Sequence, residues 1–442
     1  SMKRFFLFLH KTITMQLHSL YQVYLKHPMI CIDTRKITPG CLFFALKGPN
    51  FNGNAFTNEA LEKGAQWVII DEEAYKISEQ CILVDDVLSC LQQLATYHRK
   101  QLNIPFIAIT GSNGKTTTKE LITSVLKTSF KTVATVGNLN NHIGVPLTIL
   151  SIPLNTEMAI IEMGANHQRE IASYCDIALP NFGLINNCGK AHIEGFGGEE
   201  GVRKGKGELY DFLIAHEGTI FLNSDLDYLV DMSAASKHKI TYGSQDANYI
   251  AKPIMTNTFI GAAILNKDAE TIIHSNLVGA YNFPNILAAV CIGMHFGIKI
   301  DTIKEAIENY QPDNSRSQLT KKGTNTIILD AYNANPSSMK VALENFASMP
   351  YEHKIVWLGA MKEMGKDAHK EHQQLIALLN AHPWEQVILV GKEFETTTHP
   401  YLWFENTAMA EDYIKKQVIE NKTILIKGSR ASKMELLFEA IA

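Results

Sequence analysis

In the segment ITGSNGKTTTKE, residues 109–120, a glycine-rich turn is followed directly by one lysine and three consecutive threonines. The apolar run FIAIT at 106–110 leads into the turn, and a helical pattern follows it. Backbone N–H groups of such a turn, together with the N-terminus of the helix, point at one place and bind phosphate oxygens. Lys115 would then reach the terminal phosphates, and the Thr116 hydroxyl would ligate Mg²⁺. The pattern therefore predicts a site for a nucleoside triphosphate.

This turn is shorter than the full phosphate-binding pattern, which needs glycine at position 109, where isoleucine stands. The alternative is an ordinary strand-to-helix turn that carries a solvated lysine. The apolar strand expected before the turn and the helix expected after it favour the phosphate site.

Residues that can bind a metal follow two later apolar runs. Glu162 lies at the end of the first run, MAIIEM at 158–163. The next expected strand lies within 177–187, and His192 follows it. In a doubly wound sheet ligands collect beyond the carboxyl ends of the strands, so both residues are expected to face the phosphates. A carboxylate suits Mg²⁺, whereas histidine is an unusual ligand for it. On sequence alone, a structural role stays open for each.

Other polar residues carry weaker signals. Asp330 ends an apolar run and Arg316 precedes it; an aspartate so placed commonly meets a ribose hydroxyl, and an arginine binds phosphate or carboxylate. Asn282 and Asn285 would cap the long helix beside them or bind a base edge. Residues 138–142 form a polar loop, and its residues alone favour ordinary turn formation over a binding role.

The elements that must position these residues fall into three regions. Residues 1–103 mix short β-rich runs with helical stretches. From residue 104 buried apolar runs alternate with amphipathic helices, which is typical of βαβ units around a parallel sheet. Residues 239–279 alternate like strands and are expected to form an antiparallel flank. After residue 312 a further series of strands and helices indicates a Rossmann-like domain. We predict an α/β fold with domains at 1–103, 104–312 and 313–442.

Composition excludes several classes of protein. Lysine and arginine total 41 against 45 acidic residues, so the formal charge of −4 argues against a nucleic-acid partner. Hydrophobic residues make up 46% and charged residues 19%, which is ordinary for globular domains and rules out a mainly disordered chain. The seven cysteines are scattered without a CxxC pair, so neither a zinc ribbon nor a disulfide framework is indicated.

Nothing in the sequence indicates a membrane segment, because no stretch of about 18 apolar residues occurs. The apolar run FFLFL near the N-terminus is too short for a secretory signal and lacks a cleavage site of small residues. Ser1 is interpreted as a tag remnant, with Met2 or Met15 as the natural start. We expect a cytoplasmic protein with no membrane partner.

Taken together, the motifs resemble the Mur ligases, the ATP-dependent ligases of bacterial cell-wall precursor synthesis. The matching segments occur in the family's order: TGSNGKTT, NNHIGVP, IIEMGAN, AHIEGFG with GKGEL, GAYNFPN and DAYNANPSSM. DTRKITPGCLFFALKGPNFNGNAF at 33–56 and KGSRASKME at 427–435 extend the resemblance over nearly the whole chain. The short glycine loop is the form that this family uses. The segment GAMKEMG at 359–365 departs from the family's usual GDM-x-ELG at two positions.

The resemblance implies a central ATP-binding domain, an N-terminal domain for the UDP-sugar, and a Rossmann-like C-terminal domain for the incoming dipeptide. Its closest pattern is that of the member that joins D-alanyl-D-alanine to UDP-N-acetylmuramoyl-tripeptide through an acyl phosphate. A DNPR motif, expected of the ligase that adds a diamino acid, is absent. ATP and Mg²⁺ are the implied cofactors, and a monomer is expected.

The resemblance also implies roles residue by residue. The ATP phosphates would be held by Gly111, Ser112, Asn113, Gly114, Lys115, Thr116 and Thr117. Mg²⁺ would be bound by Thr116, Glu162, His192 and, if it is carbamoylated, Lys206, with Lys204 as the alternative lysine. The implied catalytic groups are Lys115, His192 and Lys206.

Further contacts are implied for the remaining ligands. The nucleotide would also meet Asn282, Asn285, Arg316 and Asp330. The uridine nucleotide would meet Thr34, Arg35 and Lys47. The peptide would be bordered by Asn140, Asn141 and His142, and the incoming dipeptide by Lys427, Ser429 and Arg430.

Three other functions stay open. A P-loop GTPase or small-molecule kinase is one, although the nearest match to the guanine-binding N-K-x-D pattern, at 266–269, has the wrong register. A second is a binding or regulatory protein that keeps the fold without catalysis. The third, a different Mur ligase, is the most serious, and the identity of the accepted amino acid or dipeptide would separate it.

Overall fold

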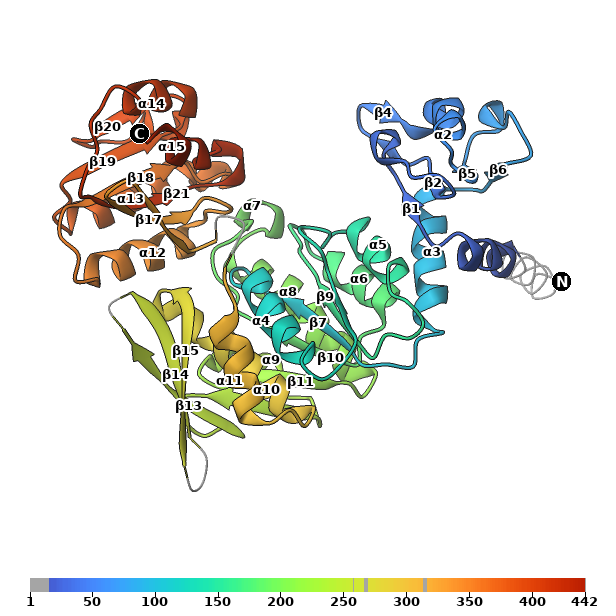
Figure 1. Cartoon of the computed structure of the whole chain (residues 1–442), viewed down its shortest axis with the longest axis horizontal. Coiled ribbons are helices and arrows are strands. Elements are labelled where there is room, and N and C mark those ends of the chain that lie inside the picture. Colours follow the sequence, from blue (N-terminus) through green and yellow to red (C-terminus); the bar gives the residue numbers. More distant parts are fainter. Residues whose placement is uncertain (1–15, 257, 266–268, 313–315, 442) are drawn as a thin grey trace. The chain divides into compact units, whose positions relative to one another are not determined.

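A computed structural model of the chain describes residues 16–256, 258–265, 269–312 and 316–441 (Figure 1). The two candidate start methionines and the 266–268 part of the guanine-like pattern lie outside the described residues. By backbone contacts the chain forms two compact units. The first comprises the chain up to residue 108 together with 130–164 and 171–181, and the second comprises 109–129, 165–170 and everything from 182 onward. The predicted domain boundaries at 103 and 312 stay predictions.

The N-terminal part of the first unit is built on a four-stranded parallel sheet in the order β1-β2-β5-β6. Its strands are β1 (Ile30–Cys31), β2 (Leu42–Phe44), β5 (Trp67–Ile70) and β6 (Cys81–Leu83). Residues 16–26 are helical, and the other helices are α2 (Thr57–Glu62) and α3 (Val87–Arg99). A short hairpin is formed by β3 (Lys47–Gly48) and β4 (Phe51–Asn52). The short strands and helical stretches expected in this region are confirmed.

A nine-stranded sheet carries the predicted phosphate site, in the order β15-β14-β13-β12-β11-β10-β7-β9-β8. Its first strands are β7 (Phe106–Thr110), β8 (Thr132–Ala134), β9 (Met158–Glu162), β10 (Phe182–Ile185) and β11 (Thr219–Asn223). The others are β12 (Lys239–Gly243), β13 (Tyr249–Met255), β14 (Phe259–Leu265) and β15 (Glu270–Val278). Every residue of β7 and β9 is buried, which is why these strands are continuous apolar runs without alternation.

The expected antiparallel flank begins later than predicted. β12 pairs in parallel with β11 and with β13, and antiparallel pairing starts only between β13 and β14. The expectation that all of 239–279 is antiparallel is therefore wrong for its first strand. Alternating apolar residues show that one face of a strand is buried, but they do not encode the direction of its neighbour.

Helices flank these strands as the βαβ pattern requires. They are α4 (Lys115–Leu126), α5 (Gly144–Leu150), α6 (Glu170–Ala178), α7 (Ile193–Phe196), α8 (Glu199–Ala215), α9 (Asp227–Met232), α10 (Phe283–His295) and α11 (Ile300–Asn309). α10 is buried over most of its length, and its Gly293 lets it lie directly against Val125 of α4. None of the helices formed by the described residues has the length and apolar character that crossing a bilayer requires.

Residues 316–441, here called the C-terminal lobe, contain a six-stranded sheet in the order β16-β17-β21-β18-β19-β20. Its strands are β16 (Gln318–Lys322), β17 (Asn325–Asp330), β18 (Lys354–Gly359), β19 (Gln386–Val390), β20 (Leu402–Phe404) and β21 (Thr423–Lys427). Its helices are α12 (Pro336–Ser348), α13 (Ala368–Asn380), α14 (Thr407–Ile414) and α15 (Glu435–Ala440). All strand pairs are parallel except β16 with β17.

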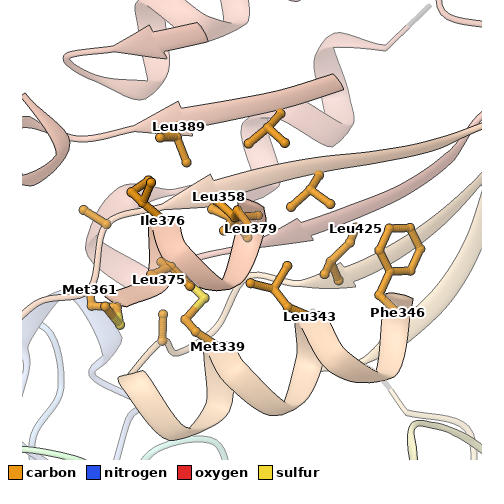
Figure 2. Close-up of a cluster of buried hydrophobic side chains, with 14 of the residues drawn as sticks. Met339, Leu343, Phe346, Leu358, Met361, Leu375, Ile376, Leu379, Leu389 and Leu425 are labelled. Atoms are coloured by element: carbon orange, nitrogen blue, oxygen red, sulfur yellow. The ribbon is translucent and has the colours of Figure 1, made fainter. Parts of the chain in front are cut away.

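Two separate cores cover the two faces of this sheet. On one face Met339 and Leu343 of α12 and Ile376 of α13 pack on Leu358 and Leu425 of the strands (Figure 2). On the other face the apolar residues of α14 and α15 meet the alternate strand residues. The lobe is therefore doubly wound, as predicted, and its ligands are expected beyond the carboxyl ends of β17, β18 and β21.

Candidate nucleotide and peptide-ligase site

The phosphate loop, residues 111–117, lies between β7 and α4 as the sequence predicts. Neighbouring backbone holds it from the side: Ser112 N–H donates to the Asn187 carbonyl at 2.9 Å, and Ser112 Oγ donates to the Gly189 carbonyl at 2.9 Å. The Asn187 side chain accepts from Asn113 N–H at 3.0 Å and donates to the Asn113 carbonyl at 3.1 Å. The loop is thus fixed before any ligand binds.

Two glycines of the loop have conformations and surroundings that no other residue fits. Gly114 precedes α4 at a φ of 81°, and a Cβ there would lie 2.9 Å from Asn285 Oδ1. Gly111 has a φ of 151°, and a Cβ there would lie 2.9 Å from Asn186 Cβ. Because glycine has no side chain at either position, an anion can approach the backbone N–H groups closely.

Lys115 and Thr116 stand in the first turn of α4. Lys115 Nζ donates to the Gly111 carbonyl at 2.7 Å, so the ammonium group lies back across the loop that would hold the phosphates. Thr116 is buried in the same turn. Both stand in the first turn of the helix, as the sequence predicts, and their roles toward phosphate and Mg²⁺ stay predictions.

A chain of buried amides supports the loop from beneath. Asn186 Nδ2 donates to Thr118 Oγ1 at 2.7 Å and to Asn285 Oδ1 at 3.1 Å. Asn285 Nδ2 donates to Asn282 Oδ1 at 2.8 Å, and Asn282 Nδ2 donates to the Val278 carbonyl at 2.8 Å. Asn282 and Asn285 are therefore structural supports of the loop in this structure, and their predicted contact with the nucleotide stays a prediction.

Replacing Asn285 with alanine is expected to lower the free energy of unfolding by about 2 kcal/mol, because Asn186 loses a buried hydrogen-bond acceptor. Urea unfolding monitored by circular dichroism measures the change. Asn103→Ala, at an exposed position, is the matched control and should change stability by less than about 0.5 kcal/mol. Equal stability of the two variants would contradict a supporting role for this amide chain.

Lys206 is almost completely buried on α8, only 1% exposed. Its Nζ donates to the Ala165 carbonyl at 3.1 Å and lies 5.0 Å from the centre of the Phe196 ring. Gly205 makes this arrangement fit, since a Cβ there would overlap the Phe196 ring. Burial lowers the pKa of Lys206 to about 7, and the charge of Lys115 adds to the effect. The neighbouring Lys204 is exposed, so Lys206 is the better candidate for a special role.

His192 precedes α7 with a φ of 53°, and its Nδ1 contacts the Glu363 carboxylate of the C-terminal lobe. Burial lowers the pKa of His192; the charges of Lys115 and Lys206 lower it further, while Glu363 opposes them. A histidine whose Nδ1 meets a carboxylate keeps Nε2 for a second partner, the arrangement common among metal-binding histidines. Sequence reasoning noted the segment containing Glu363 but assigned the residue no role.

Glu162, at the end of β9, is 1% exposed, and its Oε1 accepts from Asn140 Nδ2 at 2.8 Å. Asn141 Oδ1 accepts from the N–H groups of Ile143 and Gly144, so it begins α5. The His142 carbonyl accepts from the Gln92 side chain at 3.0 Å, while its imidazole is exposed. The predicted peptide contacts of this loop stay predictions beside these structural roles.

The carboxylate and imidazole groups described above suit a metal ion that is bound together with the phosphates of a nucleotide. Within the described ranges, no three His, Cys, Asp or Glu side chains gather into a cage for a cation. Mg²⁺ is usually bound through one or two carboxylates, phosphates and water rather than by such a cage. The backbone at Gly111 and Gly114, with Lys115 and Thr116 beside it, is suited to the phosphates of a magnesium nucleotide.

The phosphate loop and the segment 187–192 both contact the C-terminal lobe. Asn335 Nδ2 donates to Asn113 Oδ1 at 2.7 Å, and Lys190 N–H donates to Ser337 Oγ at 2.8 Å. Lys190 Nζ lies 3.4 Å from Glu371 Oε1. Sequence reasoning did not select these residues, although Asn335 and Ser337 lie in the Asn-rich turn and helix start that it noted after Asp330.

The residues predicted to bind ligands in the C-terminal lobe meet one another. Lys427 Nζ donates to Asp330 Oδ2 at 2.6 Å and to the Asn333 carbonyl at 3.2 Å. Ser429 is buried nearby, and Arg430 is exposed. The Arg316 guanidinium lies over the Tyr332 ring. Their predicted roles toward ribose, phosphate and dipeptide stay predictions.

The residues predicted to bind uridine are engaged locally in the first unit. Arg35 pairs bidentately with Asp33 and is 85% exposed, and this pairing lowers the pKa of Asp33 to about 2. Thr34 begins the same short helical turn. Lys47 Nζ lies 2.9 Å from Asp71 Oδ1 and 2.8 Å from Glu72 Oε1. Lys47 would have to exchange these partners to bind a diphosphate.

Fold and site together define an ATP-dependent ligase, and comparison with known proteins identifies the class. Three family models match the chain: "Mur ligase family, catalytic domain" at 27–99, "Mur ligase middle domain" at 109–293 and "Mur ligase, glutamate ligase domain" at 315–430. The chain belongs to the Mur ligase family. The predicted family and α/β fold class are confirmed.

Several of the proteins that are similar to this chain bear the name of one member of the Mur ligase family. UDP-N-acetylmuramoyl-tripeptide–D-alanyl-D-alanine ligase of Escherichia coli (strain K12) is 33% identical over 423 residues, covering 93% of each chain. The enzyme of the same name from Bacillus subtilis (strain 168) is 34% identical over 92% of this chain and 91% of its own. The crystal structure of MurF from Acinetobacter baumannii superposes with a TM-score of 0.84 at 29% identity, covering 93% of this chain and 92% of its own. MurF ligase from Thermotoga maritima in complex with ADP gives 0.83 at 26%, over 93% and 96%.

Proposed function

We propose that the protein joins D-alanyl-D-alanine to UDP-N-acetylmuramoyl-tripeptide at the expense of ATP, forming the UDP-N-acetylmuramoyl-pentapeptide precursor of peptidoglycan. The phosphate loop carries this proposal, because its bare glycines and the lysine lying across it suit a triphosphate. Relatives that bear the name of this activity match more than nine-tenths of the chain.

The chemistry explains why a phosphate loop serves a peptide ligase. A peptide carboxylate is a poor electrophile, because the oxygen it would have to expel is a very poor leaving group. Transfer of the γ-phosphoryl group of ATP to that carboxylate forms an acyl phosphate and ADP. The amine of the dipeptide then attacks the carbonyl carbon, the new C–N bond forms, the amine loses a proton, and inorganic phosphate leaves.

The two reacting anions must be brought together against their repulsion. Lys115 and the N–H groups of the phosphate loop offset that repulsion and stabilise the charge that develops. Mg²⁺, when bound, supplies further neutralisation of the phosphate oxygens. We assign Thr116, Glu162 and His192 to holding it.

The other ligand contacts follow the family pattern. We assign Asn282, Asn285, Arg316 and Asp330 to the nucleotide, and Thr34, Arg35 and Lys47 to the uridine end of the UDP-peptide. Asn140, Asn141 and His142 are assigned to its peptide. Lys427, Ser429 and Arg430 are assigned to the incoming dipeptide.

Lys206 is proposed to react with CO2. The neutral amine attacks the carbon of CO2, an N–C bond forms, and a proton is released, leaving a carbamate anion. Burial supports this proposal, since it favours an amine without its proton. The carbamate would be a further anionic oxygen ligand for Mg²⁺.

The decisive experiment measures ADP release by the full chain with UDP-tripeptide, comparing D-alanyl-D-alanine, L-lysine and no acceptor. We expect release to depend on the dipeptide, with a rate at least about tenfold above the other two arms. Release with L-lysine alone would instead identify a different Mur ligase. A preference for GTP in the same assay would favour the GTPase alternative.

The protein is further proposed to act as a monomer in the cytoplasm. The seven cysteines, all of which lie in the described residues, form no disulfide, which agrees with a reducing compartment. Light scattering coupled to size exclusion tests the oligomeric state, and a mass near twice 49.3 kDa would contradict the proposal.

A further inference from the structure

Two arginines of the C-terminal lobe lie against the same aromatic ring. The Arg316 guanidinium carbon lies 3.6 Å from the centre of the Tyr332 ring, and that of Arg430 lies 5.1 Å from it. The arginines are 114 positions apart in the sequence, yet they converge on one side chain. Within the described part of the lobe, neither guanidinium is ion-paired with a carboxylate.

The ring that they share is held from both ends. Tyr332 lies between Asp330 and Asn333, and Lys427 Nζ donates to both of these neighbours, at 2.6 Å to the carboxylate and 3.2 Å to the carbonyl. Asp330 and Lys427 are register partners at the ends of β17 and β21. The loop carrying the ring is therefore tied to the central strand of the sheet.

The arginine backbones are tied to the same frame. Ser317, directly after Arg316, donates its N–H to Asp330 Oδ1 at 3.3 Å and has a φ of 48°. Arg430 begins a short helical turn that follows β21 at once. Both arginines are thus anchored near the carboxyl ends of β17 and β21, where ligands of a doubly wound sheet collect.

The charges at this place do not balance. Arg316, Arg430 and Lys427 contribute three positive charges and Asp330 one negative charge, a formal surplus of two. The Asp330 carboxylate is already bound to Lys427 and to Ser317 N–H. Contact with an aromatic ring stabilises each guanidinium, but it does not remove the repulsion between them. An oxyanion would, and the planar forks of arginine suit one.

We propose that Tyr332 is a positioning residue that holds Arg316 and Arg430 together as one oxyanion site, rather than as members of two separate subsites. The inference rests on the proposed function for its two possible ligands, the carboxylate of the dipeptide and a phosphoryl group. What is new is the ring as shared support and the joint action of both arginines.

The test uses binding as well as turnover. Thermal unfolding of the full chain is followed with D-alanyl-D-alanine, with D-alanyl-D-alaninamide, which lacks the carboxylate, and with inorganic phosphate. We expect at least one of the two oxyanions to raise the melting temperature, and the amide to protect less than the dipeptide if the carboxylate is the ligand. Protection by phosphate alone assigns the site to a phosphoryl group.

Variants then test the ring itself. Tyr332→Leu is expected to lose that protection and to raise about tenfold the KM for the dipeptide, or the KM for ATP if phosphate is the protecting ligand. Tyr332→Phe, which keeps the ring, stays within about twofold of the wild type. Phe438→Leu is the matched control, because it removes a ring that lies under Lys322 in the same lobe. Circular dichroism shows whether each variant folds, and Arg316→Lys and Arg430→Lys repeat the test should Tyr332→Leu not fold.

The arginine variants also test joint action. If both guanidinium groups bind one oxyanion, the double variant should bind little worse than either single variant, so the two effects are not additive. Independent, multiplying effects would overturn the proposal, as would equal protection of the wild type and Tyr332→Leu, or no protection of the wild type by either oxyanion. A wild-type enzyme that ligates the dipeptide but gives these results refutes this inference alone; failure of ligation in the wild type refutes the proposed function.

Discussion

Replacing Lys115 with alanine is expected to lower kcat for dipeptide-dependent phosphate release by about 10²- to 10³-fold. The Nζ of Lys115 lies across the phosphate loop, 2.7 Å from the Gly111 carbonyl, where the terminal phosphates of ATP would be held. The charge on the transferring phosphoryl group develops there, so loss of the ammonium group removes stabilisation that is strongest in the transition state. Steady-state phosphate release with saturating UDP-tripeptide measures the effect.

Lys127, at the other end of α4, provides the control for this experiment. Lys127→Ala removes the same side chain from an exposed position and should leave kcat within about twofold, as for most surface substitutions. If Lys115→Ala turns over normally while its circular dichroism matches the wild type, the loop does not hold the reacting phosphate.

Lys206→Met should have two opposite effects. Activity is expected to fall by about 10²-fold or more, because methionine cannot form the carbamate that would complete the metal site. The folded protein should nevertheless become more stable near neutral pH, since a buried amine is replaced by an apolar side chain of similar length. The kcat is measured in buffer that contains bicarbonate, so that the wild type can form the carbamate. The melting temperature is measured in buffer depleted of CO2, so that Lys206 is a free amine.

The pH dependence follows from the lowered pKa. Lys206 titrates near pH 7 in the folded protein, against about 10.4 in an unfolded chain. Between these values the unfolded chain binds a proton that the folded protein does not, so the wild type gains stability as the pH rises. The advantage of the methionine variant should therefore be largest at and below pH 7 and vanish near pH 10.

Lys204→Met is the natural comparison, because Lys204 is exposed two positions away on the same helix. It should change neither the melting temperature nor kcat appreciably. A Lys206→Met enzyme with full activity would remove Lys206 from the site, whatever its stability.

The phosphate loop could be predicted from sequence because its signal is local. A buried strand, a glycine-rich turn and a lysine at the start of a helix are all contained in residues 106–120. The strands and helices around it follow equally local patterns of apolar residues. The predicted antiparallel pairing of β12 was wrong, because pairing direction is set by the rest of the sheet and not by a local pattern.

The residues that sequence reasoning missed act across long separations. Asn335 and Asn113 are 222 positions apart, and no local pattern links them. Glu363 meets His192 through a loop whose role depends on the packing of the C-terminal lobe. Asn186 and Asn187 had a usable signal, because two asparagines directly after a buried strand stand at the ligand edge of a parallel sheet.

Gly189 joins two parts of the machinery at a single peptide unit. Its carbonyl accepts the Ser112 hydroxyl of the phosphate loop, and a Cβ on it would lie 2.9 Å from Ser337 Oγ of the C-terminal lobe. One added methyl group would crowd Ser337 and would also touch Asn113 of the phosphate loop, 3.5 Å away. The phosphate loop and the C-terminal lobe therefore meet at a position that has no room for a side chain. Which substitutions residue 189 tolerates is set by both of them together.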